Sequence, residues 1–216
     1  MTGIFISFEG TEGGGKSTQI QLLAERLKKM GRAVRVLREP GGTSIGEEIR
    51  HTLKHSEANH AMTSEAELLL MNASRAQLVR EVIRPALAAG EIVLCDRFYD
   101  STTAYQGYGR QLDLAKVREI VDIAVGPTRP DLTLLLEVSI EISEARRRAR
   151  QATGNSAGVP RDRMEEAGRA FFERVQLGFQ AIAAAEPRRV QVLDASQPIE
   201  AVRARIWEAV APFVIG

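Results

Sequence analysis

The sequence predicts an α/β protein in which helices cover both faces of a parallel sheet. Short apolar, β-prone runs alternate with helical patterns along the chain, and this alternation is typical of repeated βαβ units. The chain also opens with a strand, a glycine-rich turn and a helix, which begin the first such unit. With 216 residues it is long enough to bury a substantial core, and it shows no internal repeat or interdomain linker. We therefore expect one domain over residues 1–216, with five parallel strands.

The composition is that of a globular protein, with 44% hydrophobic and 26% charged residues. This excludes disorder, collagen and coiled coil as descriptions of the whole chain. The formal net charge of +1 gives no bulk electrostatic reason to bind nucleic acid or an acidic membrane. Cys95 is the single cysteine, so an internal disulfide and a cysteine-based zinc cluster are excluded. No leader precedes Ile4 and no apolar run approaches the length of a membrane span, so we expect a soluble, cytoplasmic protein.

The most informative stretch runs from Ile4 to Thr18 and reads IFISFEGTEGGGKST. It contains the motif G-x-x-x-x-G-K-[ST], in which glycines let successive backbone N–H groups point at phosphates and the next helix presents its positive end. Lys16 can reach the outer phosphates, and the Ser17 hydroxyl suits a Mg²⁺ ligand. The stretch therefore predicts an ATP-phosphate-binding loop, and a flexible glycine-rich turn is the structural alternative. The predicted loop residues are Gly10, Thr11, Glu12, Gly13, Gly14, Gly15, Lys16, Ser17 and Thr18.

The following elements continue the pattern. Residues 16–30 form an amphipathic helix that Gly31 ends, and residues 33–37 form the next strand. Residues 38–43 (Arg-Glu-Pro-Gly-Gly-Thr) make a loop at the carboxyl end of that strand. Open α/β sheets bind ligands at such ends, although an ordinary turn has the same composition. Residues 44–53 then form a polar helix.

Residues 63–89 give the longest helical pattern, and Ser64 with Glu67 makes a capping box at its start. Its apolar stripe consists of Leu68, Met71, Leu78 and Val82, and Arg75 falls inside this stripe. A guanidinium there needs an anionic partner or a path to water. Arg75 therefore either reaches water or pairs with a protein carboxylate, or it faces a ligand in a cavity.

A further strand over residues 91–95 delivers Asp96 and Arg97 at its carboxyl end. In phosphate-loop enzymes a carboxylate at such a strand end holds Mg²⁺ or its waters. Residues 101–110 are polar and aromatic and contain glycines, which suits either a binding loop or a plain surface loop.

The rest of the chain completes the alternation. A helix over residues 114–124 precedes a strand over 132–138, and the next helix ends in an arginine-rich run that reaches Arg150. Residues 151–160 are small, polar and flexible, so the arginines are either a solvated face or part of a mobile lid over phosphates, at about residues 146–163. The last predicted elements are a helix from residue 163, a strand over 190–193 and a helix over 198–210.

These parts favour transfer of a phosphoryl group to another phosphate. The three histidines, His51, His55 and His60, lie on and after one polar helix, where we expect them to be solvated. A hydroxyl acceptor benefits from a general base, whereas a phosphate with a second pKa near 6 is already mostly a dianion at neutral pH. The main difficulty is then to bring two anions together, and arginines aimed at both would do so.

The chain resembles bacterial thymidylate kinases over essentially its whole length. The resemblance rests on ordered motifs: Phe8-Glu9-Gly10, Arg38 to Thr43 with Gly46-Glu47 and Arg50, Glu67 to Arg75, Asp96-Arg97-Phe98, Ala104-Tyr105-Gln106-Gly107, Arg129 to Thr133, and Asp162-Arg163. It implies a P-loop fold of the nucleoside monophosphate kinase type, with ATP as donor, Mg²⁺ as cofactor and a homodimer as the assembly. The implied reaction is phosphorylation of dTMP to dTDP on the route to dTTP.

The resemblance also implies roles for residues. Lys16, Arg97 and Arg150 would be catalytic. Arg150 is included because no basic residue stands between Gly10 and Gly15, and the family variant of this kind takes its catalytic arginine from the lid. Arg147 and Arg148 are neighbouring candidates for that role. Ser17, Asp96 and Glu9 would be near the metal. The implied dTMP-binding set is Glu9, Glu39, Pro40, Arg50, Met71, Arg75, Arg97, Ser101, Thr102, Tyr105 and Gln106.

One departure concerns the base. Met71 stands where the family often has a phenylalanine that stacks on thymine, and its thioether can also contact a ring. The alternatives to dTMP phosphorylation are a kinase of another nucleoside monophosphate or small metabolite, and a switch protein that hydrolyses its nucleotide slowly. Against a switch, the sequence has no N-K-x-D stretch of the kind that reads guanine.

Overall fold

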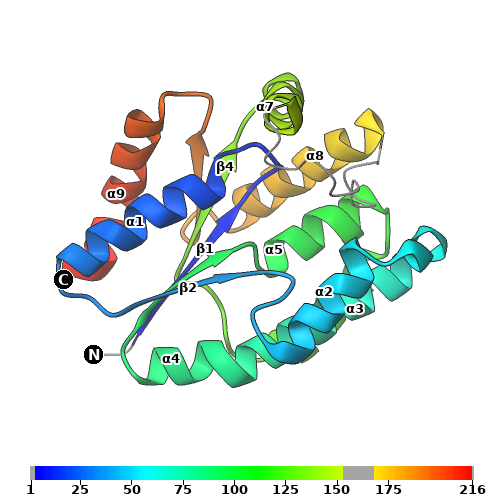
Figure 1. Cartoon of the computed structure of the whole chain (residues 1–216), viewed down its shortest axis with the longest axis horizontal. Coiled ribbons are helices and arrows are strands. Elements are labelled where there is room, and N and C mark those ends of the chain that lie inside the picture. The colour runs from blue at the N-terminus through cyan, green and yellow to red at the C-terminus, as the bar shows by residue number, and fades with distance from the viewer. Residues whose placement is uncertain (1–2, 153–167, 216) are drawn as a thin grey trace.

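The computed structural model describes residues 3–152 and 168–215. Within these ranges the strands are β1 (Ile4–Glu9), β2 (Val34–Arg38), β3 (Ile92–Asp96), β4 (Leu132–Glu137) and β5 (Val190–Asp194). They lie in the order β2-β3-β1-β4-β5, and every pairing is parallel (Figure 1). This confirms the predicted five-stranded parallel sheet.

The helices follow the predicted alternation, with most boundaries shifted by a few residues. The α-helices are α1 (Lys16–Lys29), α2 (Ser44–Lys54), α3 (Ser64–Leu78), α4 (Arg84–Ala88), α5 (Tyr99–Thr102), α6 (Leu114–Val125), α7 (Ile140–Ala152), α8 (Arg169–Ala185) and α9 (Ile199–Ile215). A 3₁₀ turn, η1 (Glu57–Ala61), precedes α3, and two π-helical segments are η2 (Val79–Ile83) and η3 (Thr103–Gly109). Because η2 joins α3 to α4, the predicted long helix over residues 63–89 is present with a π-helical middle.

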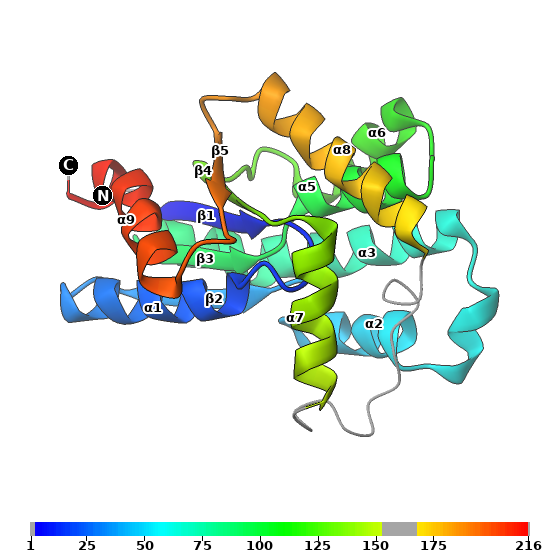
Figure 2. The same ribbon diagram turned by 90° about the horizontal axis from the view of Figure 1, so that it is seen from above.

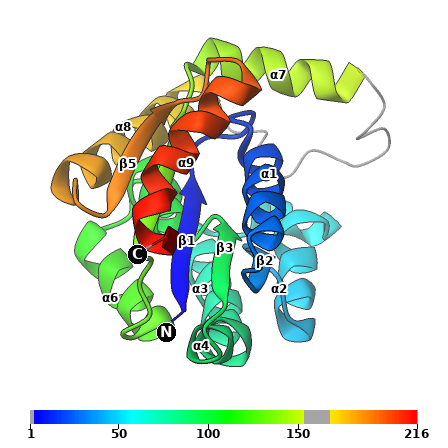
Figure 3. The same cartoon turned by 90° about the vertical axis from the view of Figure 1, so that its left-hand side faces the viewer.

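Each face of the sheet has its own core. Alternate side chains of a strand point to opposite faces, so Ile6 and Phe8 pack with α1 and α9, while Phe5 packs with α3 and α6. Figure 3 shows α1 and α9 on one side of the sheet and α3, α4 and α6 on the other. A third cluster joins α8 and η3 to β4 through Tyr105 and Leu135, together with Phe171, Val175 and Phe179. The prediction that helices cover both faces is therefore confirmed.

The strands bring three functional candidates to one edge of the sheet. Phe8 lies opposite Asp96, and Arg38 lies opposite Asp96 from the other side. Because the strands are parallel, Glu9, Glu39 and Arg97 leave neighbouring strands at the same carboxyl edge. The phosphate loop follows β1 at this edge, and α7 projects from the body beyond it (Figure 2).

Two local predictions were wrong. Residues 101–109 are helical in α5 and η3 rather than a loop, and Ala104, Tyr105 and Gln106 are buried there. The N-cap of α3 is Thr63, whose Oγ1 accepts a hydrogen bond of 3.2 Å from Ala66 N, so Ser64 is not the cap. Glu67 is consequently available for contacts outside the helix end.

The predicted lid lies only partly in the described structure. Residues 146–152 belong to α7, and residues 153–163 fall outside the described ranges. No helix among the described residues is both long enough and apolar enough to span a membrane.

Candidate active site

The phosphate loop depends on glycines where its backbone turns. Gly10 has φ 122°, and a Cβ atom there would lie 2.3 Å from the carbonyl oxygen of Leu136 on β4. Gly15 has a left-handed conformation directly before the first residue of α1, with φ 82°. Only glycine adopts both conformations without strain, so the loop can pack on β4 and still enter the helix. This places the amino end of α1, with its unsatisfied N–H groups, at the carboxyl edge of the sheet.

Lys16 lies inside the loop. Its Nζ atom donates hydrogen bonds to the carbonyl oxygens of Gly10 (3.1 Å) and Thr11 (3.0 Å). Burial lowers the pKa of Lys16 to about 7, and the nearby charge of Arg97 acts in the same direction. An anion placed beside Lys16 would restore its full charge, which is the electrostatic property of a phosphate site.

Helix α7 holds the other side of the loop. Ser143 Oγ donates to the Glu12 carbonyl at 2.6 Å, and Arg146 Nη1 donates to the carbonyls of Gly13 (3.2 Å) and Ala195 (3.0 Å). The guanidinium of Arg146 therefore bridges the phosphate loop and the segment after β5.

Ser17 and Asp96 bring two side-chain oxygens together. Ser17 Oγ donates a hydrogen bond of 2.8 Å to Asp96 Oδ2, across the gap between α1 and the end of β3. A hydroxyl and one carboxylate fit Mg²⁺, which takes few protein ligands and completes its shell with phosphate oxygens and water. No cluster of three or more His, Cys, Asp or Glu side chains suited to a metal occurs in residues 3–152 and 168–215.

Arg97 faces the same space from the end of β3. Its backbone has φ 70°, a left-handed conformation that is costly for a residue with a Cβ atom, and its N–H is tied to the Phe8 carbonyl at 2.9 Å. Its guanidinium donates to Ser101 Oγ (2.9 Å) and Tyr105 Oη (3.3 Å). Burial by itself would lower the pKa of Arg97, but Tyr105 and neighbouring carboxylates hold that pKa above its ordinary value. Arg97 is therefore a fixed, permanent cation.

Glu9 is fully buried behind Arg97. Its carboxylate accepts hydrogen bonds from Phe98 N (2.7 Å) and Ser101 Oγ (2.5 Å). Burial, reinforced by the charge of Asp100, raises the pKa of Glu9 to about 8. Both oxygens already have protein partners, so the predicted contacts of Glu9 with metal or sugar stay predictions.

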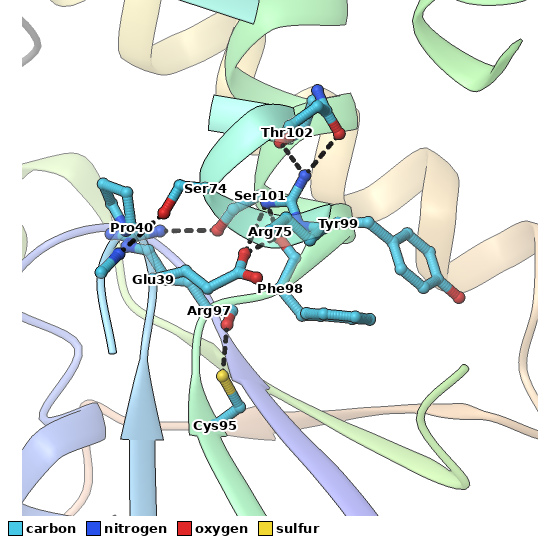
Figure 4. Close-up of polar contacts among 12 residues, drawn as sticks. Glu39, Pro40, Ser74, Arg75, Cys95, Arg97, Phe98, Tyr99, Ser101 and Thr102 are labelled. Carbon is cyan, nitrogen blue, oxygen red and sulfur yellow. Dashed lines mark hydrogen bonds and ion pairs between the residues drawn. The ribbon is translucent and has the colours of Figure 1, made fainter. Parts of the chain in front are cut away.

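Arg75 and Glu39 form a buried ion pair (Figure 4). Glu39 Oε2 lies 2.8 Å from Arg75 Nε and 2.6 Å from Nη2, while Nη1 donates to Asn72 Oδ1 and Thr102 Oγ1, both at 2.9 Å. Glu39 Oε1 is buried and has no hydrogen-bond partner among the described residues. Burial raises the pKa of Glu39, and Arg75 opposes that rise. Arg75 thus has the carboxylate partner that the sequence allowed, and it also lines a cavity.

That cavity has a volume of about 400 Å³ and brings most of the predicted residues together. Its walls contain loop residues with Lys16, Ser17 and Asp96 at one end and Arg97 beside them. The predicted dTMP-binding residues on its walls are Glu39, Pro40, Met71, Arg75, Arg97, Ser101, Thr102, Tyr105 and Gln106. Donor-side and acceptor-side candidates therefore share one continuous space.

Some predicted residues are not among the lining residues. These are Glu9, Gly10, Thr11, Gly14 and Arg50. Gly14 instead borders a second cavity, and Arg50 donates to the Pro40 carbonyl at 2.8 Å. Arg150 belongs to α7, but its side chain, like that of Arg147, lies outside what the structure describes.

Three lining residues were missed by the sequence reasoning: Lys54, Arg146 and Phe172. Lys54 lies one turn after Arg50 in α2, and this i, i+4 spacing puts both cations on one face. Phe172 follows the core residue Phe171 in α8. Arg146 opens the arginine run that was predicted as a lid. The helical spacing from Arg50 could have identified Lys54 as a site residue. The positions of Arg146 and Phe172 at the cavity depend on tertiary packing, which the sequence does not reveal.

A smaller cavity of about 230 Å³ lies on the other side of Arg146. It is bordered by the phosphate loop, by Gln197 and by the start of α9. Gln19 donates to the Ile199 carbonyl there at 2.9 Å, and its buried Oε1 has no partner among the described residues. A polar ligand group could therefore contact this cavity wall.

Comparison with known proteins identifies the family. The family model described as "Thymidylate kinase" matches residues 8–206. The chain belongs to the thymidylate kinase family. A thymidylate kinase of Syntrophotalea carbinolica is 49% identical over 203 residues, covering 94% of this chain and 93% of that protein. One of Pseudomonas fluorescens is 47% identical over 215 residues, covering 100% of this chain and 98% of that protein.

A solved structure supports the same assignment. The crystal structure of thymidylate kinase from Ehrlichia chaffeensis superposes with a TM-score of 0.76 at 31% sequence identity. The match covers 98% of this chain and 99% of that chain. The fold is therefore the thymidylate kinase P-loop fold, and the cavity described above lies in the fold that these relatives share.

Proposed function

We propose that the chain transfers the terminal phosphoryl group of ATP to dTMP, with ATP on the phosphate loop and dTMP in the 400 Å³ cavity. The observation that supports this arrangement is the shared wall: Lys16 and Ser17 of the loop line the same cavity as Arg97. A thymidylate kinase phosphorylates dTMP to dTDP, and this is the activity of the chain. The family uses ATP as the donor. The residue roles below are our proposal.

The donor phosphates would lie on the backbone N–H groups of residues 10–18, with Lys16 against the terminal phosphate. Ser17 and Asp96, already 2.8 Å apart, would hold Mg²⁺. When bound, the ion would neutralise charge on the donor phosphates. The nucleoside of ATP would occupy the smaller cavity beside Arg146 and Gln197.

The acceptor phosphate would lie against Arg97, with Arg50 nearby at Pro40. Ser101 and Tyr105 hold the Arg97 guanidinium in place before any ligand arrives, so little ordering is required on binding. No general base is required, because the acceptor phosphate is already mostly a dianion at neutral pH. The cations between donor and acceptor reduce the repulsion of the two anions, and this is the catalytic effect that we assign to Lys16 and Arg97.

The nucleoside of dTMP would occupy the far end of the cavity. Arg75, Gln106 and Thr102 supply polar groups there, and Met71, Pro40 and Phe172 supply apolar surface. Phe172 and Met71 line this end of the cavity, and the Met71 thioether would contact the base. Glu9 would approach the sugar through the Ser101 hydroxyl that it already holds.

We propose four further features of the protein from its sequence and its resemblance to the family. Residues 1–216 form one domain, with a lid at about residues 146–163 that closes over the phosphates. Arg150 supplies the catalytic arginine, as in the lid-arginine variant of the family. The enzyme is a homodimer. It acts in the cytoplasm.

A coupled assay of ADP release tests the proposal. We expect turnover of dTMP to exceed that of dUMP, CMP, AMP and shikimate when each is supplied at the same concentration with ATP. Equal turnover across the panel would contradict the acceptor assignment. Binding of dTMP without any phosphoryl transfer would indicate a nucleotide-dependent switch instead.

A further inference from the structure

A buried polar chain lies behind the nucleobase end of the cavity and involves Glu67, Gln106 and Arg110. Gln106 Nε2 donates a hydrogen bond of 2.8 Å to Glu67 Oε1. Arg110 grips the same carboxylate with two bonds, from Nε to Oε1 at 3.2 Å and from Nη2 to Oε2 at 2.9 Å. Glu67 is 2% exposed and Gln106 is 1% exposed. The three residues come from α3, η3 and the turn after η3, so this contact exists only in the folded chain.

Arg110 holds the Glu67 carboxylate in position, because it donates hydrogen bonds to both carboxylate oxygens. A bidentate guanidinium is a strong partner for a buried carboxylate, and removing it would leave an uncompensated charge. The Arg110 guanidinium itself lies 4.8 Å from the ring centre of Phe171, which is part of the core beneath α8. The carboxylate is therefore fixed in orientation from two sides.

An ionised carboxylate can only accept hydrogen bonds. The amide of Gln106 must then turn its NH₂ group toward Glu67, whatever ligand is present. Its carbonyl oxygen is left for the cavity, whose wall includes Gln106. Among the described residues no protein group donates to that oxygen. The cavity thus presents an acceptor whose orientation cannot be reversed without losing the bond to Glu67.

We propose that Glu67, held by Arg110, is a positioning residue that fixes the Gln106 amide so that the pocket selects thymine over cytosine. This inference rests on the proposed function, in which Gln106 and Arg75 border the nucleobase. Thymine offers a ring N–H next to its O4 acceptor, and this N–H complements the Gln106 carbonyl. Cytosine offers a ring nitrogen that accepts and an amino group that donates. To bind cytosine as well, Gln106 would have to flip, and Glu67 opposes the flip.

The variant Glu67→Gln tests this directly. Its side-chain amide can donate as well as accept, so Gln106 becomes able to adopt either orientation. We expect the ratio of kcat/KM for dTMP to that for dCMP to fall about tenfold, mainly through the KM values, because one base-specific hydrogen bond changes. The matched control is Glu186→Gln, which also removes a carboxylate that accepts two bonds from one arginine, Arg189, away from the cavity. We expect the control to keep the wild-type ratio.

A double-mutant comparison separates positioning from mere support of the fold. In a Gln106→Leu background there is no amide to orient, so adding Glu67→Gln should leave the dTMP to dCMP ratio unchanged within about twofold. An equal fall of the ratio in both backgrounds would overturn the proposal. So would a wild-type ratio in Glu67→Gln, even if the variant melted at a lower temperature.

If Glu67→Gln gives no cooperative melting transition, Arg110→Lys carries the same test. Lysine keeps the charge but cannot grip the carboxylate with two bonds, so we expect the ratio to fall about threefold. An unchanged ratio in this folded variant would overturn the proposal. Failure of the wild-type enzyme to prefer dTMP in the same assay would instead overturn the assignment of the cavity.

Discussion

The donor loop and the acceptor cavity are built in different ways. The loop is one continuous stretch, residues 10–18, whose phosphate-binding groups are mainly backbone N–H groups positioned by glycine conformations. The acceptor cavity is assembled from side chains of α3, α5, η3 and the segments that follow β2 and β3. Hydrogen bonds hold these parts together across 36 residues (Glu39 to Arg75), 39 residues (Glu67 to Gln106) and 92 residues (Glu9 to Ser101). The loop's shape follows from local sequence, whereas the cavity's shape requires the tertiary fold.

The difference extends to electrostatics. In the loop, Lys16 donates to the Gly10 and Thr11 carbonyls, and burial lowers its pKa, so a phosphate is its natural counter-ion. In the cavity, Arg75 and Arg110 are already paired with Glu39 and Glu67. Changes in the loop should therefore affect chemistry, while changes in the cavity should affect acceptor binding and folding. The following variants test this contrast, from the largest expected effect to the smallest.

Lys16→Ala should cause the largest change. We expect kcat to fall about a thousandfold, because a cation aimed at the transferring phosphoryl group is removed. The melting temperature should stay within about 3 °C of wild type, since only two hydrogen bonds to backbone carbonyls are lost. A coupled kinetic assay and a thermal melt measure both quantities. Lys28→Ala, on the exposed side of the same helix, is the control. A kcat within threefold of wild type would remove Lys16 from the mechanism.

Arg75→Met should act mainly on stability. It leaves the buried Glu39 carboxylate without its cation, which costs about 3–5 kcal/mol in comparable cases. The loss of unfolding free energy should depend on pH because of Glu39. The pKa of Glu39 is raised in the folded protein and would rise further without Arg75. Stability that such a group contributes is present below its unfolded pKa and is lost as pH rises through the folded pKa. Urea unfolding should thus show a larger deficit at pH 8 than at pH 5.

The control for Arg75→Met is Arg205→Met, which breaks the exposed pair with Glu208 on α9. We expect this change to leave the unfolding midpoint nearly unaltered, because exposed pairs contribute little. A deficit for Arg75→Met that is independent of pH would contradict the assigned coupling to Glu39.

Arg97→Ala should reduce kcat/KM for dTMP about a hundredfold, because a fixed charge-assisted contact with the acceptor phosphate is lost. The KM for ATP should change much less. Steady-state kinetics with each substrate varied in turn give both values. An equal rise of both KM values would mean that Arg97 does not distinguish donor from acceptor.

Arg150→Ala should have the smallest effect. We expect kcat to fall about tenfold with little change in the KM for ATP, because a lid arginine would act on the transferring phosphoryl group. Arg148→Ala is the comparison, since Arg148 is exposed and pairs with Glu144 within α7. A loss in Arg148→Ala that exceeds the loss in Arg150→Ala would transfer the role to Arg148.

The sequence predicts the locally encoded part of the molecule well. The order of strands and helices follows from apolar periodicity, and the position of the phosphate loop follows from a motif that works through backbone conformation. The residues after β2 and β3 could be predicted as site candidates because carboxyl ends of parallel strands share an edge.

The sequence predicted the wrong secondary structure where glycines allow close helix packing and do not form a turn. Residues 101–110 look like a loop because of Gly107 and Gly109, yet η3 is buried. A Cβ atom on Gly109 would lie 2.6 Å from the Phe171 ring, so glycine is needed there for close approach to α8. Similarly, Glu67 matched a capping box but is committed to Gln106 and Arg110, contacts that no local pattern reveals.

The most direct test of the account is dTMP binding in the absence of ATP, measured by calorimetry on wild type, Lys16→Ala and Arg97→Ala. We expect Lys16→Ala to bind dTMP within about threefold of the wild-type Kd, since the loop serves the donor. Arg97→Ala should bind dTMP about thirtyfold to a hundredfold more weakly. Equal weakening in the two variants, or wild-type affinity in Arg97→Ala, would contradict the division of the site into a donor loop and an acceptor cavity.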